Sequence, residues 1–194
     1  RTLSGVGFID TTPTANTTWT LTSTPASGPT LQSQVSVRVF PTKQEWRASF
    51  FSPSDLANPL KESTLWGDQT DPDGDGISNG AEYAAQTPPL SGTKSEVLRS
   101  DIAGLVVSST TQSYPVHVLR ELLPDAGYVY EAQSSENLST WNVVPWSSLV
   151  EVSRQTGATG QTDLVTLRMP DSIAQSSGAA PKRFYRVVLK PSTP

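Results

Sequence analysis

The densest cluster of carboxylates in the chain lies between Asp71 and Glu82, which read Asp-Pro-Asp-Gly-Asp-Gly-Ile-Ser-Asn-Gly-Ala-Glu. This spacing fits the EF-hand calcium-loop pattern at every defining position. Calcium is a hard cation that takes about six to eight oxygen ligands, and alternate carboxylates in a tight loop present their oxygens on one side. The sequence therefore predicts one bound Ca²⁺, with ligands from Asp71, Asp73, Asp75, the Ile77 carbonyl, Asn79 (directly or through water) and Glu82.

The alternative is a polar turn whose acids merely face solvent. Four carboxylates within this short segment repel one another, which disfavours the turn without a cation. Gly76 stands where a calcium loop must turn sharply. Magnesium fits less well, because it demands octahedral geometry and keeps its waters. We therefore expect calcium.

The flanks of the loop differ from those of a regulatory EF-hand. Residues 66–70, Trp-Gly-Asp-Gln-Thr, have no helical period, and Pro88 and Pro89 stop the segment that leaves the loop. A half EF-hand without a second loop cannot swing a pair of helices open. We expect a structural clip with the weak affinity of extracellular modules, about 10⁻⁴ to 10⁻³ M.

Composition excludes several classes of function. The 194 residues carry a net charge of -4, with 16% charged residues, no Cys and one His. A nucleic-acid partner needs a clustered basic footprint, and no apolar run approaches the about 18 residues of a membrane span. Without Cys the chain has no thiol nucleophile and no zinc–thiolate site. No second acidic cluster is available for glycoside hydrolysis, so we do not expect an enzyme.

The elements that must position the loop are mostly strands. Residues 1–42 are expected to be an N-terminal β-strand segment, in which Thr17–Thr22 (half-buried) and Val35–Phe40 form a hairpin. Residues 43–100 are expected to hold a short helix over 43–51, opened by a capping box from Thr42 to Glu45, and the calcium loop. One more helical turn should follow at Ser52-Pro53.

Residues 101–194 are expected to be a C-terminal β-sandwich. Its candidate strands are Gly104–Ser108, Val116–Glu121, Tyr128–Ser134, Trp141–Val152, Leu164–Met169 and Phe184–Leu189. This spacing predicts a mainly β fold, an antiparallel, immunoglobulin-like β-sandwich with a short helix and a half EF-hand calcium loop. The lone His117 is expected to be a surface or cross-strand residue rather than a catalyst.

Several of these segments match a known pattern. They are Trp46-Arg47, Phe50-Phe51, Asp55-Leu56, the loop through Tyr83-Ala84, Tyr130–Ser135 with Leu138–Trp141, and Arg183–Val187. Together they resemble the C-terminal region of large exported proteins of Verrucomicrobia and related bacteria, over residues 45–190. The loop is also similar to thrombospondin type 3 and dockerin loops. The resemblance implies secretion and a non-catalytic terminal module. Gly80 and Ala81 replace two Leu of that family, which predicts a weaker helix after the loop.

Two hypotheses for function follow. The first is a structural or adhesive protein at the cell surface, which assembles with itself, into filaments by strand addition, or with another cell-surface protein. The second is a carbohydrate-binding accessory module of a larger secreted protein, in which Trp66, Trp141 and Trp146 present a face to polysaccharide. Core or hinge positions for these three rings are the competing interpretation. Arg rather than Met at position 1 indicates a processed or excised piece.

Overall fold

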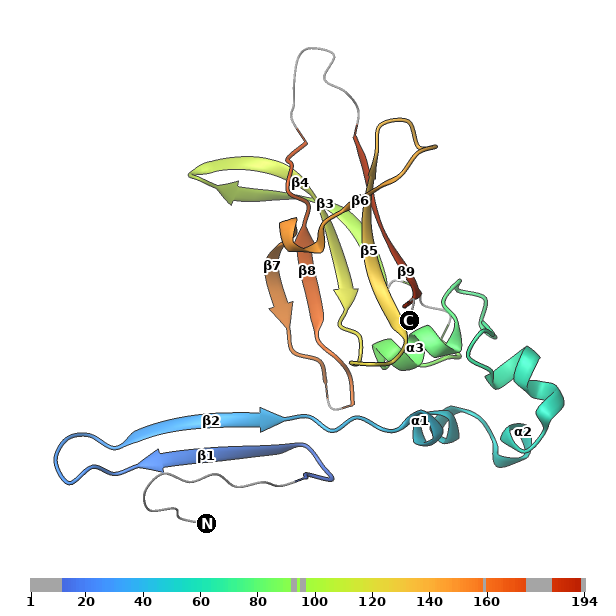
Figure 1. Cartoon of the computed structure of the whole chain (residues 1–194), viewed down its shortest axis with the longest axis horizontal. Coiled ribbons are helices and arrows are strands. Elements are labelled where there is room, and N and C mark those ends of the chain that lie inside the picture. Colours follow the sequence, from blue (N-terminus) through green and yellow to red (C-terminus); the bar gives the residue numbers. More distant parts are fainter. Residues whose placement is uncertain (1–11, 92–93, 95–96, 159, 174–182, 193–194) are drawn as a thin grey trace. The chain divides into compact units, whose positions relative to one another are not determined.

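The computed structural model describes residues 12–91, 94, 97–158, 160–173 and 183–192 (Figure 1). The chain divides into two compact units, Arg1–Pro41 and Thr42–Pro194. Most of its regular structure consists of strands in antiparallel sheets, so the expected mainly β class is confirmed. Within the described ranges, no helix is long and apolar enough to cross a membrane.

The first unit contains a β-hairpin made of β1 (Thr17–Ser23) and β2 (Leu31–Val37). Cross-strand partners share a face, so one face is apolar and the other carries hydroxyl and amide groups. The apolar face consists of Trp19, Leu21, Leu31, Val35 and Val37. The expected hairpin is confirmed, although β2 lies earlier than Val35–Phe40. The expected half burial of Thr17–Thr22 is wrong. Only Thr17 and Trp19 of β1 are partly buried, and Leu21 is 66% exposed.

The second unit opens with helix α1 (Lys43–Phe50), which begins with the expected capping box. The Thr42 hydroxyl accepts from the Glu45 amide, and Glu45 Oε2 accepts from the Thr42 amide at 2.8 Å. These bonds satisfy amides that the first turn leaves unpaired. Trp46 and Phe51 are buried. Three short turns follow, namely α2 (Pro53–Leu56) with Ser52 as its cap, the 3-10 turn η1 (Pro59–Lys61) and the π-turn η2 (Glu62–Trp66).

The described strands of the second unit form two antiparallel sheets (Figure 1). One has the order β3-β4-β8-β7, from β3 (Leu98–Val107), β4 (Thr110–Arg120), β7 (Val150–Gln155) and β8 (Leu164–Arg168). The other has the order β6-β5-β9, from β5 (Tyr128–Ser135), β6 (Asn142–Val144) and β9 (Phe184–Pro191). Both sheets contribute to one hydrophobic core, made of Leu119, Val165, Leu167, Met169, Ala132 and Val187.

The expected strand over Trp141–Val152 is wrong, because the chain changes sheet in the middle of it. β6 ends at Val144, just before Pro145, which has no backbone N–H to donate to a ladder. A 3-10 turn, η4 (Trp146–Ser148), then leads to β7 in the other sheet. The segment is therefore two edge strands joined by a crossover.

The strands expected at Gly104–Ser108 and Val116–Glu121 belong to one long hairpin of β3 and β4, paired from Leu98 with Leu119 to Val107 with Thr110. Its turn consists of Ser108 and Ser109, with φ angles of 51° and 65°. Asn-Gly is the usual sequence for a two-residue turn with positive φ at both positions. A Ser-Ser pair carries no such signal, so the turn was not predicted.

Candidate metal centre

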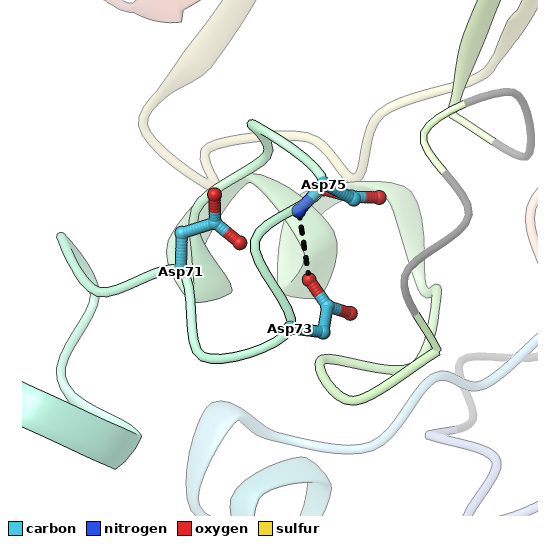
Figure 2. Close-up of side chains that lie close together, drawn as sticks. All are labelled: Asp71, Asp73 and Asp75. Atoms are coloured by element: carbon cyan, nitrogen blue, oxygen red, sulfur yellow. Dashed lines mark hydrogen bonds between the residues drawn. The ribbon is translucent and has the colours of Figure 1, made fainter.

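The loop of residues 71–82 is shaped by hydrogen bonds from its own amides to its aspartates. Asp71 accepts from the amides of Gly74 (2.9 Å) and Gly76 (2.8 Å). Asp73 accepts from the Asp75 amide at 3.3 Å, drawn as the dashed line in Figure 2. Gly74 and Gly76 have φ angles of 75° and 87°, a region that side chains rarely adopt. The sharp turn predicted at Gly76 is therefore present.

The three aspartates converge, with one carboxylate oxygen from each lying within 4.8 Å of the others (Figure 2). Burial and the charges of Asp73 and Asp71 raise the pKa of Asp75, although the Ile77 amide and Lys94 act in the opposite direction. Carboxylates held this close repel one another, and a divalent cation among them removes that repulsion. Geometry and charge both fit a hard cation.

Glu82 gives an independent indication of a ligand. It lies on α3 (Asn79–Ala85), is only 1% exposed, and its Oε2 accepts no hydrogen bond from the part of the chain that the structure describes. Burial, followed by the charges of the three aspartates, raises the pKa of Glu82 to about 9. A buried carboxylate without a partner is costly to ionise. The group of carboxylates that lie within 4.8 Å of one another contains Asp71, Asp73 and Asp75 but not Glu82, so the role of Glu82 as a ligand stays a prediction.

Asn79 has a role that sequence reasoning missed. Its Nδ2 donates to the carbonyls of Leu65 (2.8 Å) and Gly67 (3.0 Å) and to the Thr70 hydroxyl (2.7 Å). The backbone N–H of Asn79 donates to the Thr70 carbonyl at 2.8 Å. Asn79 therefore ties the segment before the loop to the start of α3. Only Oδ1, which has no hydrogen-bond partner among described residues, remains available for the expected role toward the ion.

No long helix flanks the loop, as expected for a half EF-hand. The π-turn η2 precedes it, and the seven-residue α3 follows it. Instead, α1 contacts both sides: Lys43 and Arg47 bond to Asp68 at 2.9 and 2.8 Å, while the Trp46 ring packs edge-on against Tyr83 with centroids 5.8 Å apart. These contacts attach α1 to the residues on both sides of the loop.

The other side of the loop is attached to the sheets. Ile77 is buried with Ala81, Ala85 and Val97, and this small core packs against Leu122, Tyr128 and Leu189. The Leu123 amide donates to the Ala84 carbonyl at 2.7 Å, and the Thr162 hydroxyl donates to the Ala85 carbonyl at 2.9 Å. The loop of residues 71–82 is therefore packed against the strands through α3. The role of the Ile77 carbonyl as a ligand remains a prediction.

Gly80 lies where the packing leaves no room for a side chain. A Cβ at position 80 would lie 2.6 Å from the Tyr128 hydroxyl and 3.1 Å from the Asp68 carbonyl oxygen. Gly80→Ala should lower the free energy of unfolding by about 1–3 kcal/mol, as overpacking does. Gly104→Ala is the control, because its Cβ would meet only Thr111 Cγ2 at 3.8 Å. Equal melting temperatures for the two variants would contradict the predicted clash.

The remaining candidate residues lie in separate places. Arg47 covers the Trp66 ring (5.2 Å), Arg186 covers Trp141 (3.9 Å), and Trp146 stacks on Tyr130 (6.4 Å, 8° between planes). Each tryptophan therefore has a different partner. His117 is buried and lies opposite Ser100, whose hydroxyl is 2.8 Å from Nδ1, so the expected cross-strand position is confirmed. Burial lowers its pKa to about 4.

No protein-family model, curated protein or solved structure matches the chain.

Proposed function

We propose that the chain is a non-catalytic, calcium-binding structural or adhesive protein of the cell exterior. The observation that carries the calcium site is Glu82, a buried carboxylate without a hydrogen-bond partner among the described residues, beside three converging aspartates. We further propose that the two sheets form an immunoglobulin-like β-sandwich, which their common core supports. An exterior location suits a half EF-hand, since extracellular modules bind calcium at about 10⁻⁴ to 10⁻³ M.

In this proposal the ion is a structural clip. The loop connects α1, through Asp68 and Tyr83, with the sheets, through Ala84 and Ala85. Since the ligands come together only in the folded chain, calcium should stabilise folding rather than switch a conformation.

Chelation should therefore lower the melting temperature and open the region near residues 60–90 to protease. A ligand at one hundred times its Kd adds about 2.7 kcal/mol to the free energy of unfolding. The measurement is thermal unfolding and limited proteolysis in excess calcium and in excess chelator, with magnesium as the ion control. A melting curve that is indifferent to chelator would show that the loop has no structural role.

The same proposal includes self-association through the first unit. An isolated two-stranded hairpin is marginal in water, and the apolar face of the β1–β2 hairpin is largely exposed. The segment Thr17–Val37 contains no charged residue, and charge is a common protection against unwanted strand pairing. We propose that this hairpin adds to the sheet of a neighbouring copy.

Deleting residues 1–41 should leave a folded monomer that still binds calcium, because Thr42–Pro194 is a compact unit by itself. The full chain should increase in size with concentration, as measured by light scattering and electron microscopy. If the full chain stays monomeric and the deletion variant is unfolded at every concentration, the hairpin packs within its own chain and not on a neighbouring copy.

The carbohydrate-binding alternative has less support. It rests on a shared aromatic face, whereas two of the three tryptophan rings are covered by arginines and the third stacks on Tyr130. Binding of polysaccharide to the wild-type chain, weakened by Trp146→Ala, would favour this alternative.

A further inference from the structure

An open cleft of about 450 Å³ lies between the two sheets. Its apolar wall consists of Leu119, Val165 and Leu167, which are buried members of the common core. Tyr130 and Trp146, which is 44% exposed, line it from the other sheet and the crossover turn. The cleft therefore borders the hydrophobic core on one side of the second unit. Clefts of this size and apolar character are the usual form of a binding site.

The cleft borders an unpaired stretch of β5. β6 pairs only with Ala132–Ser134, because the chain turns away at Pro145. Within the described chain, the preceding residues Tyr128–Glu131 therefore have a partner strand only on the β9 side. Tyr128, Val129 and Tyr130 also line the cleft. Unpaired backbone beside an apolar cleft is the arrangement that accepts an added strand.

The two edges of the four-stranded sheet, β7 and β3, are better protected than this one. β7 has a bulge between Glu151 and Ser153, and it places Glu151 and Arg154 at the cleft. β3 carries Arg99 and Asp101. Charges and bulges discourage strand addition. The stretch Tyr128–Glu131 has no proline and no bulge, and its one charged residue, Glu131, forms an ion pair with Lys190 of β9.

The β1–β2 hairpin has the features that such an acceptor would bind, namely a strand edge and an exposed apolar face. Among the described residues, β1 pairs only with β2. On the apolar face of the hairpin, Leu21 and Val35 are 66% and 61% exposed. Trp19 and Leu21 are two residues apart on the same face of β1, so both can enter one cleft.

We propose that the β5 edge and cleft of one copy accept the hairpin of a second copy, with β1 pairing along Tyr128–Glu131 and Trp19 and Leu21 in the cleft. The inference rests on the proposed self-association and names its acceptor. Each copy carries one donor and one acceptor, so the contact is head-to-tail and builds rings or filaments.

Charge supports this pairing. The mouth of the cleft carries three carboxylates and one guanidinium, from Glu121, Asp125, Glu151 and Arg154. By sequence, residues 1–41 carry Arg1, Asp10 and Arg38, a formal net charge of +1 (two basic residues minus one acidic residue). A cationic donor therefore meets an acceptor with net negative charge, which favours correct encounter.

Sedimentation velocity of the full chain in calcium, over a concentration series, tests the acceptor. Leu21→Ser weakens the donor, with Thr20→Ser on the polar face as its control. Val129→Lys places a charge at the cleft, with Val143→Lys on the exposed part of β6 as its control. Wild type and controls should associate, and both test variants should associate at least about tenfold more weakly.

Mixing the two test variants gives the sharpest result. Leu21→Ser retains an intact cleft and Val129→Lys retains an intact hairpin, so the mixture should form a one-to-one dimer and nothing larger. If Val129→Lys and Val143→Lys have equal melting temperatures, both in calcium and in chelator, the fold of Val129→Lys is intact. If Val129→Lys melts lower, Trp146→Ser replaces it as the acceptor variant.

The experiment separates failure of the proposed acceptor from failure of the proposed self-association. If Leu21→Ser abolishes association but the acceptor variants do not, self-association stands and the cleft is not the acceptor. A mixture that stays monomeric also overturns the acceptor. A wild-type chain that is monomeric at every concentration overturns self-association and the acceptor together, while the calcium site is unaffected.

Discussion

In calcium-free buffer at pH 7, Glu82→Gln should be more stable than the wild-type protein, and in saturating calcium it should lose most of this advantage. Burial and the three aspartates raise the pKa of Glu82 to about 9, whereas the unfolded chain ionises it near 4.5. Without calcium, folding at pH 7 must therefore protonate Glu82, at a cost on the order of 3 kcal/mol. Gln is nearly isosteric and does not incur this cost.

In saturating calcium most of this advantage should disappear, because the wild-type carboxylate binds the ion and Gln supplies only one neutral oxygen. We expect the calcium affinity of Glu82→Gln to fall about 100-fold or more. The measurement is the free energy of unfolding in calcium and in chelator for both proteins. Glu136→Gln is the control, since that side chain is 65% exposed on the surface. A variant less stable than wild type in both buffers would show that Glu82 has only a packing role.

The second large effect is the pH dependence of calcium-free stability. Between pH 7 and 8.5 the folded protein holds a proton on Glu82 that the unfolded chain has already lost. Unfolding therefore releases a proton, so a rise in pH destabilises the fold, by about 1.4 kcal/mol per pH unit. This window avoids His117, whose pKa of about 4 in the folded state gives the opposite slope below pH 6.5.

Two comparisons isolate the contribution of Glu82. The difference in unfolding free energy between wild type and Glu82→Gln should change with pH in chelator and should be flat in saturating calcium, where the bound carboxylate is ionised. Calcium affinity should rise about tenfold per pH unit over the same window, since binding expels the proton. Parallel stability curves for the two proteins in chelator would show that Glu82 is already ionised without calcium.

Local features of this structure could be predicted from the sequence. The loop spacing, the turn at Gly76 and the Thr42–Glu45 capping box each depend on residues a few positions apart, and all are present. Alternating patterns located most strands for the same reason. The cluster of three aspartates was predicted because they are neighbours in the chain.

Features that depend on distant residues could not be predicted. Nothing in the sequence near Gly80 indicates that Tyr128 will lie against it. Likewise, nothing near Asn79 indicates that its side-chain Nδ2 will donate to backbone carbonyls that precede the loop. The crossover at Pro145 was missed because the apolar residues on both sides of it suit a single strand. The open cleft follows from that crossover, so it was not visible in the sequence.

The most direct test of the calcium site is a calorimetric titration of Ca²⁺ into the calcium-stripped wild-type chain at pH 7.5, with Asp73→Ala in parallel. The wild-type chain should bind one ion per chain, with a Kd of about 10⁻⁴ to 10⁻³ M, and should release close to one proton when the titration is repeated in buffers of different ionisation enthalpy. Asp73→Ala should give no binding heat over the same range. Equal heats for the two chains, or none for the wild type at millimolar calcium, would contradict the assignment of residues 71–82 as a calcium site.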